Sequence, residues 1–570
     1  MPDRIVIFMK NIENQAWKIS FFRKLLWAFT AFAGGTLYAA SLPPLNWNFA
    51  VFISLLPLLY CGCCFKWRFS AFCGWLWGIG WAFFSCNFLR EIEWFVPYLI
   101  APVLALWPAL WAALLPELKR FTLFPAEAVI WTAKRKTEYF NTALPYWRMI
   151  LFTVSSAVLF TLIEWTRSRL FVWNDFSVTQ YRNRYIIQIA SLTGSYGIGF
   201  LIALINAGIF GAIYFKKHRT ASLIVPALLT AAAIIFGVYH IRKIENLSPS
   251  ENVLRAGLVQ CDLSQRRRAT GAQIVEAIDV CTTLTTQLAR QKPDLIIWPE
   301  SAVPIPLESG GSTGDMFRFK FAETLRNGGV PVLAGLISYK PGREAGAWEV
   351  TNSALLFTPN LKLAGRYDKI HRVPYGEYVP FRKYLPQALI NAVDMGRDLA
   401  PGTNFEPVNI APGIRASIAI CYEGVFGYLT RKFALRGSNL LIVLSNDAWY
   451  PESSEPEQHL ANAVIRSVET GLFMIRCGNN GGSGVVTPDG RFTQYIGSSA
   501  RRPELLRERA IGIVSVPIYE NRTHCTLFVR CGEWFIALLG AALFALITAW
   551  TVNRFRRKKY FNKLMENKNE

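Results

Sequence analysis

The segment 418–424 places a cysteine directly after a short apolar run. That run is typical of a buried strand, and Gly424 permits a sharp turn after it. We therefore expect Cys421 to present its thiol at a strand end, where a nucleophile can act. A lone cysteine is more often an inert packing residue, so the chain must also supply a base and a group that stabilises an oxyanion.

Glu300 and Lys369 could complete such a site. A thiol with its ordinary pKa of about 8.5 is only slightly ionised at neutral pH, so it needs a base. Glu300 follows the apolar run 294–298 and Pro299, and a carboxylate in that setting can have a raised pKa that suits proton abstraction. Lys369 offers a cation to the oxyanion formed during attack on an acyl carbonyl, and the Tyr422 N–H offers a second donor.

Glu377 and Glu423 are expected nearby, where they could hold Lys369 charged and oriented. Judged singly, a helix-capping Glu300 and a solvated Lys369 are the simpler explanations. Together with Cys421 these residues predict a site for nucleophilic acyl chemistry.

These residues lie in a long, mostly polar stretch in which short apolar runs end in polar clusters. Helical stretches alternate with the runs, which predicts an α/β layout with buried strands. Ligands of such sheets collect at strand ends, where the reactive residue types also collect. The runs are 294–298, 353–357, 416–420 and 440–444, and helices are expected at 270–290 and 456–470.

The remainder of the chain is strongly apolar. The 570 residues are 52% hydrophobic and include 19 Trp and 40 Phe, which indicates membrane spans beside a further domain. Each apolar run is near the length of about 20 residues that a bilayer core requires. The first run is too long for a signal h-region, and the broken segment 121–132 is expected at the inner interface. Eight spans are expected, at 25–42, 48–65, 69–89, 94–116, 149–170, 186–215, 221–240 and 534–550.

The formal charge of +22 is mainly a topology signal. Lys and Arg gather in alternate loops and in the tail, as the positive-inside rule requires. A nucleic-acid-binding protein would instead carry them on a folded face with interleaved aromatics. With the N-terminus inside, seven spans place the polar stretch outside and the eighth returns the tail to the cytoplasm. We therefore expect a membrane domain at 1–244, a catalytic domain at 245–530, and a final span with its basic tail at 531–570.

Glu164 and Arg167 are ionisable residues near the outer end of the fifth expected span. Such residues are functional candidates, and an intrahelical ion pair that snorkels to the interface is an equal alternative. The 11 cysteines show no Cys/His spacing typical of zinc, so no metal is expected. Cys525 and Cys531 could form a disulfide or remain free thiols.

Four motifs in the polar stretch resemble the nitrilase superfamily, which uses a Glu-Lys-Cys triad. They are WPES at 298–301, YDKIHRVPYGEYVPF at 367–381, CYEG at 421–424 and SNDAW at 445–449. The span pattern and the PYGEYVPFR run at 374–382 resemble the apolipoprotein N-acyltransferase family more specifically. Glu164-Trp165-x-Arg167 also resembles that family, and the likeness extends from Leu42-Pro43-Pro44 to the basic tail.

The resemblance implies an α-helical integral membrane domain and an outward-facing nitrilase-like αββα sandwich. It implies Cys421 as the nucleophile, Glu300 as the base and Lys369 as the electrostatic stabiliser. Supporting positions follow from the same motifs. They are Glu377, Tyr422 and Glu423 at the site, Trp449 near the acyl pocket, and Asn479-Asn480-Gly481 on a strand element beside it.

The implied reaction moves a fatty acyl chain from a phospholipid, through a Cys421 thioester, to the amine of the N-terminal diacylglyceryl-cysteine of a bacterial lipoprotein. It would take place at the outer face of the inner membrane and needs no cofactor. An alternative is a membrane-tethered amidase or nitrilase that uses water as acceptor, although one anchor would then suffice. A transporter or lipid-binding protein with a relic domain would have an incomplete triad.

Two segments depart from the family pattern, and both lie where lipid substrates would enter. Residues 171–176 read Phe-Val-Trp-Asn-Asp-Phe where the family commonly has Phe-Pro-Trp. Residues 264–269 read Ser-Gln-Arg-Arg-Arg-Ala where the family often carries a Trp on a mobile loop. Arg266, Arg267 and Arg268 could meet phospholipid phosphates or form a solvated loop.

Overall fold

The chain forms two compact units in the computed structural model. One unit comprises Met1–Thr179, Tyr196–Ile235 and Trp534–Glu570, and the other comprises Gln180–Ser195 and Phe236–Glu533. The structure describes residues 2–125, 144–247, 252–265, 269–342, 347–387, 398–450, 452–497, 507–519 and 525–566. Residues 126–132 of the expected interfacial segment and Arg266–Arg268 lie outside the described residues.

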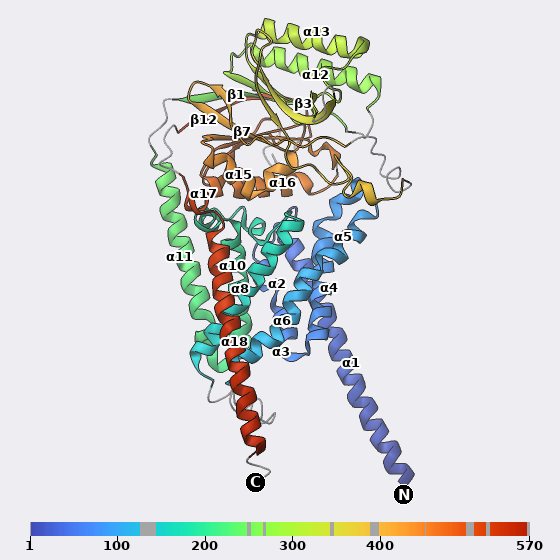
Figure 1. Ribbon diagram of the computed structural model, residues 1–570, viewed down its shortest axis with the longest axis vertical. Helices are drawn as coiled ribbons and strands as arrows, with labels where there is room; N and C mark the ends of the chain where they lie inside the picture. The colour runs from blue at the N-terminus through green and yellow to red at the C-terminus, as the bar shows by residue number, and fades with distance from the viewer. Residues whose placement is uncertain are drawn as a thin grey trace. The chain divides into compact units, whose positions relative to one another are not determined.

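The first unit is built from helices (Figure 1). Helix α4 packs against both α1 and α6, and α8 packs against α6 and α18. Close helix approach depends on Gly35, because a Cβ at this position would lie 1.9 Å from the Trp77 carbonyl oxygen. The helices named here are α1 (Pro2–Ala40), α3 (Leu56–Cys64), α4 (Trp67–Ser85), α5 (Val96–Leu104), α6 (Leu106–Leu123), α8 (Tyr146–Leu170), α10 (Ser195–Tyr214), α11 (Arg219–Glu245) and α18 (Trp534–Glu566).

Five of the described helical segments are long and apolar enough to cross a membrane: Val96–Leu123, Tyr146–Leu170, Ser195–Tyr214, Lys216–Glu245 and Trp534–Arg556. They correspond to the last five expected spans. The first and third expected spans overlap α1 and α4 and extend a few residues beyond the ends of these helices. The second overlaps the shorter apolar helix Val51–Cys64. The total of eight spans therefore remains a prediction.

The expected span at 186–215 is shorter than its apolar run suggests. Residues 186–193 form two short helical turns, and α10 begins only at Ser195. Gly194 has φ +69 and ψ −177, a backbone conformation that favours glycine, and it ends the helical turn before it. The prediction of one helix through this point was wrong because apolar content does not reveal a break at a glycine.

The described residues of the second unit form two six-stranded sheets of mixed direction. The first has the order β12-β1-β2-β3-β4-β5, with β1, β2 and β3 parallel. The second has the order β11-β10-β9-β8-β7-β6, with β7, β8 and β9 parallel.

The strands of the first sheet are β1 (Val253–Gln260), β2 (Leu295–Ile297), β3 (Val332–Pro341), β4 (Trp348–Phe357), β5 (Leu363–Asp368) and β12 (Ala510–Pro517). Those of the second are β6 (Val408–Ala411), β7 (Ile414–Ile420), β8 (Leu440–Ser445), β9 (Met474–Gly478), β10 (Gly484–Val486) and β11 (Phe492–Thr493).

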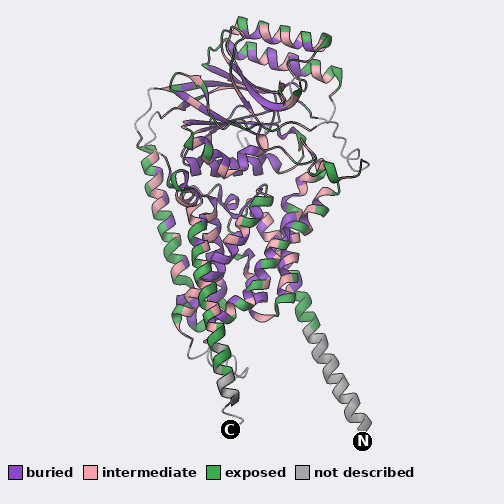
Figure 2. Cartoon of the chain, viewed as in Figure 1, coloured by how far each residue is buried: buried purple, intermediate pink, exposed green. Residues whose placement is uncertain are grey.

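The two sheets face each other, with β1 near β9 and β4 near β7. Helices α12 (Gly271–Ala289) and α13 (Gly311–Gly328) cover the first sheet, while α15 (Gly427–Leu435) and α16 (Glu455–Thr470) cover the second (Figure 1). Buried residues run along the strands of both sheets and over α16 (Figure 2). This arrangement confirms the expected αββα sandwich.

Polar residues follow the carboxyl ends of several parallel strands in this unit. Glu300 follows β2, Cys421 follows β7, and Asn446 and Asp447 follow β8. Gly335 in β3 lets the backbone before Glu300 lie close, because a Cβ there would be 2.2 Å from the Pro299 carbonyl oxygen. The fold therefore gathers at one edge side chains that are far apart in the sequence.

Candidate active site

A buried lysine lies between two carboxylates at this edge. The Lys369 Nζ is 3.0 Å from the Glu300 Oε1 and 3.0 Å from the Glu377 Oε1. The lysine side chain is only 2% exposed. Burial lowers the pKa of Lys369, but the negative charges of Glu300 and Glu377 outweigh burial and hold it well above its usual value. Lys369 is therefore a fixed cation.

Asn352 in β4 ties the same carboxylates together. Its Nδ2 donates to the Glu300 Oε1 at 2.8 Å and to the Glu377 Oε1 at 2.9 Å. Its backbone carbonyl accepts from the Lys369 N–H at 2.8 Å. The second oxygen of Glu377 accepts from the Val373 N–H at 2.8 Å. These contacts fix the orientation of both carboxylates around the lysine.

Glu423 connects the loop that carries Lys369 to the turn that carries Cys421. Its fully buried carboxylate accepts from the N–H groups of Ile370 and His371 on one side and of Ile420 on the other, at 2.8–2.9 Å. The Tyr367 hydroxyl donates to it as well. Burial raises the pKa of Glu423 to about 7, against the hydrogen bonds from the His371 and Ile420 N–H groups, which lower it.

Cys421 begins a short helical turn directly after β7 and is half-buried. Its φ of 51 is unusual for a residue with a side chain and marks a sharp change of direction. Burial raises the pKa of the Cys421 thiol well above its usual value, Glu300 raises it further, and Lys369 lowers it. The charges of both predicted partners therefore act on this thiol, which is protonated at rest at neutral pH.

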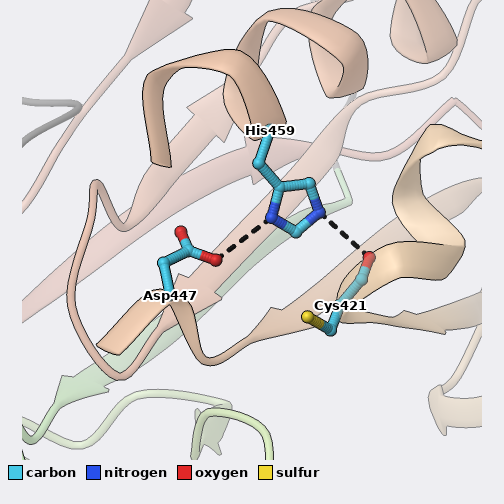
Figure 3. A group of neighbouring side chains, drawn as sticks. All are labelled: Cys421, Asp447 and His459. Atoms are coloured by element: carbon cyan, nitrogen blue, oxygen red, sulfur yellow. Dashed lines mark hydrogen bonds and ion pairs between the residues drawn. The ribbon is translucent and has the colours of Figure 1, made fainter. Parts of the chain in front are cut away.

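A second buried network lies behind the cysteine. The His459 Nε2 is 3.0 Å from the Cys421 carbonyl oxygen, and its Nδ1 is 3.1 Å from the Asp447 Oδ1 (Figure 3). Arg476 in β9 forms an ion pair with Asp447, and the side chains of both are 0% exposed. A cysteine, a carboxylate and a histidine this close could hold a metal ion. Both His459 nitrogens and both Asp447 oxygens already have partners, so we interpret the group as a hydrogen-bond network.

The structure gathers five of the expected site residues in one region, and their catalytic roles remain predictions. They are Glu300, Lys369, Glu377, Cys421 and Glu423. Tyr422 follows Cys421 in the same turn, and its ring meets the Phe426 ring edge-on at 4.9 Å. Trp449 ends the turn after β8 and is 39% exposed. The acyl-pocket position that the resemblance implies for Trp449 remains a prediction.

Glu164 and Arg167 belong to the other unit and form an ion pair of 2.6 Å along α8. The Arg167 side chain is only 1% exposed. It also donates to the Phe171 carbonyl at 2.7 Å and lies 5.0 Å from the Trp81 ring. The pair is therefore intrahelical, and its arginine is buried within the unit rather than extended to an interface. Cys525 and Cys531 are free thiols.

Sequence reasoning assigned no role to Asn352, Asp447, His459 or Arg476. Asn352 and Arg476 lie inside strands and His459 lies in a helix, so these three do not mark a strand end. Asp447 does follow the end of β8. The sequence feature that could have pointed to these residues is a polar side chain within an otherwise apolar strand. Asn352 directly precedes the apolar run of β4, and Arg476 interrupts the apolar residues of β9. A buried polar side chain needs a partner, and here the partners are the site residues.

Comparison with known proteins finds a family match in each unit. The family described as Carbon-nitrogen hydrolase matches residues 255–501, and the Apolipoprotein N-acyltransferase N-terminal domain matches residues 33–208. An amidase of known structure from Nesterenkonia sp. is similar over 48% of this chain and 92% of that chain, at 21% identity and a TM-score of 0.32.

Several curated relatives carry the name apolipoprotein N-acyltransferase. The one from Geobacter metallireducens is 32% identical over 60% of this chain and 66% of its own length, slightly under two thirds. The one from Methylococcus capsulatus is 30% identical over 65% of this chain and 68% of its own length. The one from Gloeobacter violaceus is 26% identical over 92% of this chain and 94% of its own length. With matches in both units, the chain belongs to the apolipoprotein N-acyltransferase family.

Proposed function

We propose that the protein is an apolipoprotein N-acyltransferase. It would transfer a fatty acyl chain from a phospholipid to the α-amino group of the N-terminal diacylglyceryl-cysteine of a lipoprotein. The observation that carries the proposal is the buried Lys369, held between Glu300 and Glu377 and acting on the pKa of the Cys421 thiol. A cation, a base and a thiol at one site provide the groups that acyl transfer through a thioester needs.

In the first half-reaction, the Cys421 sulfur attacks an ester carbonyl of the phospholipid. Glu300 accepts the thiol proton, because the thiol is protonated at rest. Lys369 and the Tyr422 N–H stabilise the negative oxygen of the tetrahedral intermediate. The C–O bond then breaks, the leaving alkoxide takes the proton from Glu300, and a lysophospholipid departs. The acyl chain remains on Cys421 as a thioester.

In the second half-reaction, the amine of the diacylglyceryl-cysteine attacks the thioester carbonyl. Glu300 accepts the proton that the nitrogen loses, and the same donors stabilise the second oxyanion. The C–S bond breaks, the sulfur regains a proton, and an amide is formed. The donor and the acceptor use the same thiol in turn, which is a ping-pong mechanism.

Supporting residues act through this machinery. Glu377 and Asn352 hold Lys369 charged and oriented, as their contacts with its ammonium group and backbone suggest. Glu423 keeps the Lys369 loop against the Cys421 turn. We propose a contact with the acyl chain for the partly exposed Trp449, and a role in shaping the membrane domain for the buried Glu164–Arg167 pair.

We also propose the topology that the charge distribution predicts. Eight spans would anchor the chain in the bacterial inner membrane, with both termini in the cytoplasm. The domain at 245–530 would work on the outer, periplasmic face, between the membrane domain at 1–244 and the final span and tail at 531–570. Lateral access to the bilayer would bring both lipid substrates to one site and limit attack by water on the thioester.

The test supplies purified protein with labelled phospholipid and a synthetic diacylated lipopeptide with a free N-terminus. The expected product is the lipopeptide with a third, amide-linked acyl chain, identified by mass spectrometry. A Cys421→Ala variant is expected to give none. Release of labelled fatty acid without N-acylated peptide would instead identify a hydrolase that uses water as acceptor.

A further inference from the structure

The Cys421 carbonyl oxygen has a buried side-chain partner that the reaction scheme above does not use. The His459 Nε2 lies 3.0 Å from this oxygen, and the imidazole is 0% exposed. In Figure 3 the ring stands between Asp447 and the backbone of Cys421, with its Nε2 directed at the carbonyl oxygen. A carbonyl can only accept, so Nε2 carries the hydrogen in this contact.

The position of the imidazole is fixed from its other side. Its Nδ1 contacts the Asp447 Oδ1 at 3.1 Å, and Asp447 is itself paired with Arg476. Glu455, one turn earlier on α16, has a carboxylate oxygen 3.7 Å from the same nitrogen. All residues of α16 are buried, so the ring has little freedom to rotate. His459 is therefore a rigid donor, supported by an ion pair that links the end of β8 to β9.

The peptide that follows Cys421 gives this contact a consequence for catalysis. In a trans peptide the C=O of one residue and the N–H of the next point in opposite directions. Holding the Cys421 carbonyl on the His459 side therefore directs the Tyr422 N–H to the opposite side of the peptide. That N–H is the proposed second donor to the oxyanion, so its direction decides whether the donor is available.

Cys421 needs such support because its backbone is strained. Its φ of 51 places a non-glycine residue in the left-handed region, which is disfavoured by contact between Cβ and the backbone. Without a partner for its carbonyl, the Cys421–Tyr422 peptide could rotate to a less strained orientation. The thiol could then still be present while the N–H pointed elsewhere.

We infer that His459 is a positioning residue that holds the Cys421–Tyr422 peptide in the orientation that presents the Tyr422 N–H to the oxyanion. Asp447 and Arg476 support this role indirectly, because they hold the His459 imidazole in place. This inference rests on the proposed function, because it concerns the oxyanion of that reaction. It adds a specific claim: His459 affects attack on a carbonyl without acting on the thiol itself.

Two amide substitutions separate this role from a packing role. In His459→Gln, the side-chain NH₂ can occupy the place of Nε2 and still donate to the Cys421 carbonyl. In His459→Asn, the shorter side chain places its amide near Nδ1, so it reaches Asp447 but not the carbonyl. Both variants lose the imidazole ring, and each therefore serves as the packing control for the other.

Two rates are measured on each purified full-length variant. One is the single-turnover rate of acyl-enzyme formation from labelled phospholipid. The other is the rate of Cys421 alkylation by iodoacetamide, which proceeds at a saturated carbon and forms no oxyanion. We expect His459→Asn to slow acylation about a hundredfold, as loss of one oxyanion donor does, while His459→Gln retains most of the rate. Alkylation is expected to stay near the wild-type rate in both.

Equal acylation rates in the two variants would overturn the inference, and so would a parallel fall in acylation and alkylation. The second result would show that His459 acts on the thiol or on the fold as a whole. Each of these results leaves the proposed function standing if the wild-type protein is acylated. A wild-type protein that never becomes acylated would overturn the proposed function, and this inference with it.

Discussion

At the scale of single residues, the site holds one permanently charged side chain and one thiol that is neutral at rest. Lys369 remains cationic because Glu300 and Glu377 each lie 3.0 Å from its Nζ. The Cys421 thiol is protonated at rest because burial and the nearby Glu300 outweigh the effect of the lysine on its pKa. A neutral thiol is protected from unwanted electrophiles and becomes a thiolate only when its proton can move.

This balance predicts the pH dependence of thiol reactivity. An acid with a raised pKa stays protonated until the pH approaches that pKa, so the thiolate fraction of Cys421 should be small at pH 7 and rise with pH. We expect the iodoacetamide alkylation rate to increase by about tenfold per pH unit from pH 7 to 9 without reaching a plateau. A plateau already reached at pH 7 would contradict the account.

The Lys369→Met variant tests the contribution of the lysine to the pKa of Cys421. Lys369 lowers the pKa of Cys421, so its removal should raise that pKa further and slow alkylation at every pH in this range. Arg436→Met removes an exposed cation of the same unit, with a side chain that is 59% exposed, and is the matched control. A Lys369→Met protein that is alkylated as fast as the wild type would show that the lysine does not act on the thiol.

The sequence predicted part of this site for a clear physical reason. Glu300 and Cys421 closely follow apolar runs, and Lys369 follows the run 353–357 through a turn. Strand ends are where buried sheets expose reactive groups. Asn352 and His459 could not be found in the same way, because they lie within elements rather than at their ends. Their roles arise only from pairing across the fold, which one sequence does not reveal.

At the scale of elements, the second sheet depends on a buried ion pair. Arg476 in β9 pairs with Asp447 after β8, and Asp447 in turn contacts His459 on α16. The three parallel strands β7, β8 and β9 thus share one polar network near their carboxyl ends. Removing Arg476 would leave the carboxylate of Asp447 buried without its cationic partner, beside the turn that carries Cys421.

Arg476→Met should therefore destabilise the domain strongly. We expect a loss of about 3–5 kcal/mol in the free energy of unfolding, the usual cost of removing one partner of a buried ion pair. Arg509→Met breaks an exposed pair with Glu276, in which both side chains are about half exposed, and should cost less than about 1 kcal/mol. Chemical denaturation followed by tryptophan fluorescence measures both. Equal effects of the two substitutions would show that the buried pair is not a structural link.

The elements themselves were easier to predict than their limits. Alternating apolar runs and helical stretches predicted the α/β sandwich because burial imposes that pattern on a sheet covered by helices. The run 186–215 was predicted as one span because it is mostly apolar. Gly194 divides it. Before the break, Tyr181, Arg182 and Gln188 bond to Glu457 and Asp489, which lie in the same unit as they do. A hydropathy pattern does not show which distant residues these side chains bond to.

At the scale of the whole molecule, the chain joins a unit of apolar helices to a unit that carries the proposed acyl-transfer site. Five described segments are long and apolar enough to span a bilayer, and the reactive residues lie in the other unit. The proposed substrates both carry lipid chains, which explains why a nitrilase-like domain would be joined to several spans rather than to one anchor. Composition predicted an apolar part beside a polar one, because the two kinds of stretch are clearly separated. It did not predict that Gln180–Ser195 belongs to the second unit.

Cysteine labelling in intact cells tests the proposed orientation. Ser312 on α13 and Lys558 in the basic tail are both exposed, so Ser312→Cys and Lys558→Cys offer matched probes in a Cys531→Ser background. A membrane-impermeant maleimide should label the cysteine at position 312 in cells whose inner membrane is intact. It should label the cysteine at position 558 only after lysis. The reverse pattern would invert the topology.

The central claim is that Cys421 carries a fatty acyl thioester, and trapping that intermediate tests it most directly. Wild-type protein is incubated with acyl-labelled phospholipid without an acceptor, denatured, and digested for mass spectrometry. We expect one acyl group per chain on the peptide that contains Cys421, released by neutral hydroxylamine as a thioester is, and no label on Cys421→Ala. Equal labelling of Cys421→Ala, or an acyl group on another residue of the wild-type protein, would contradict the account.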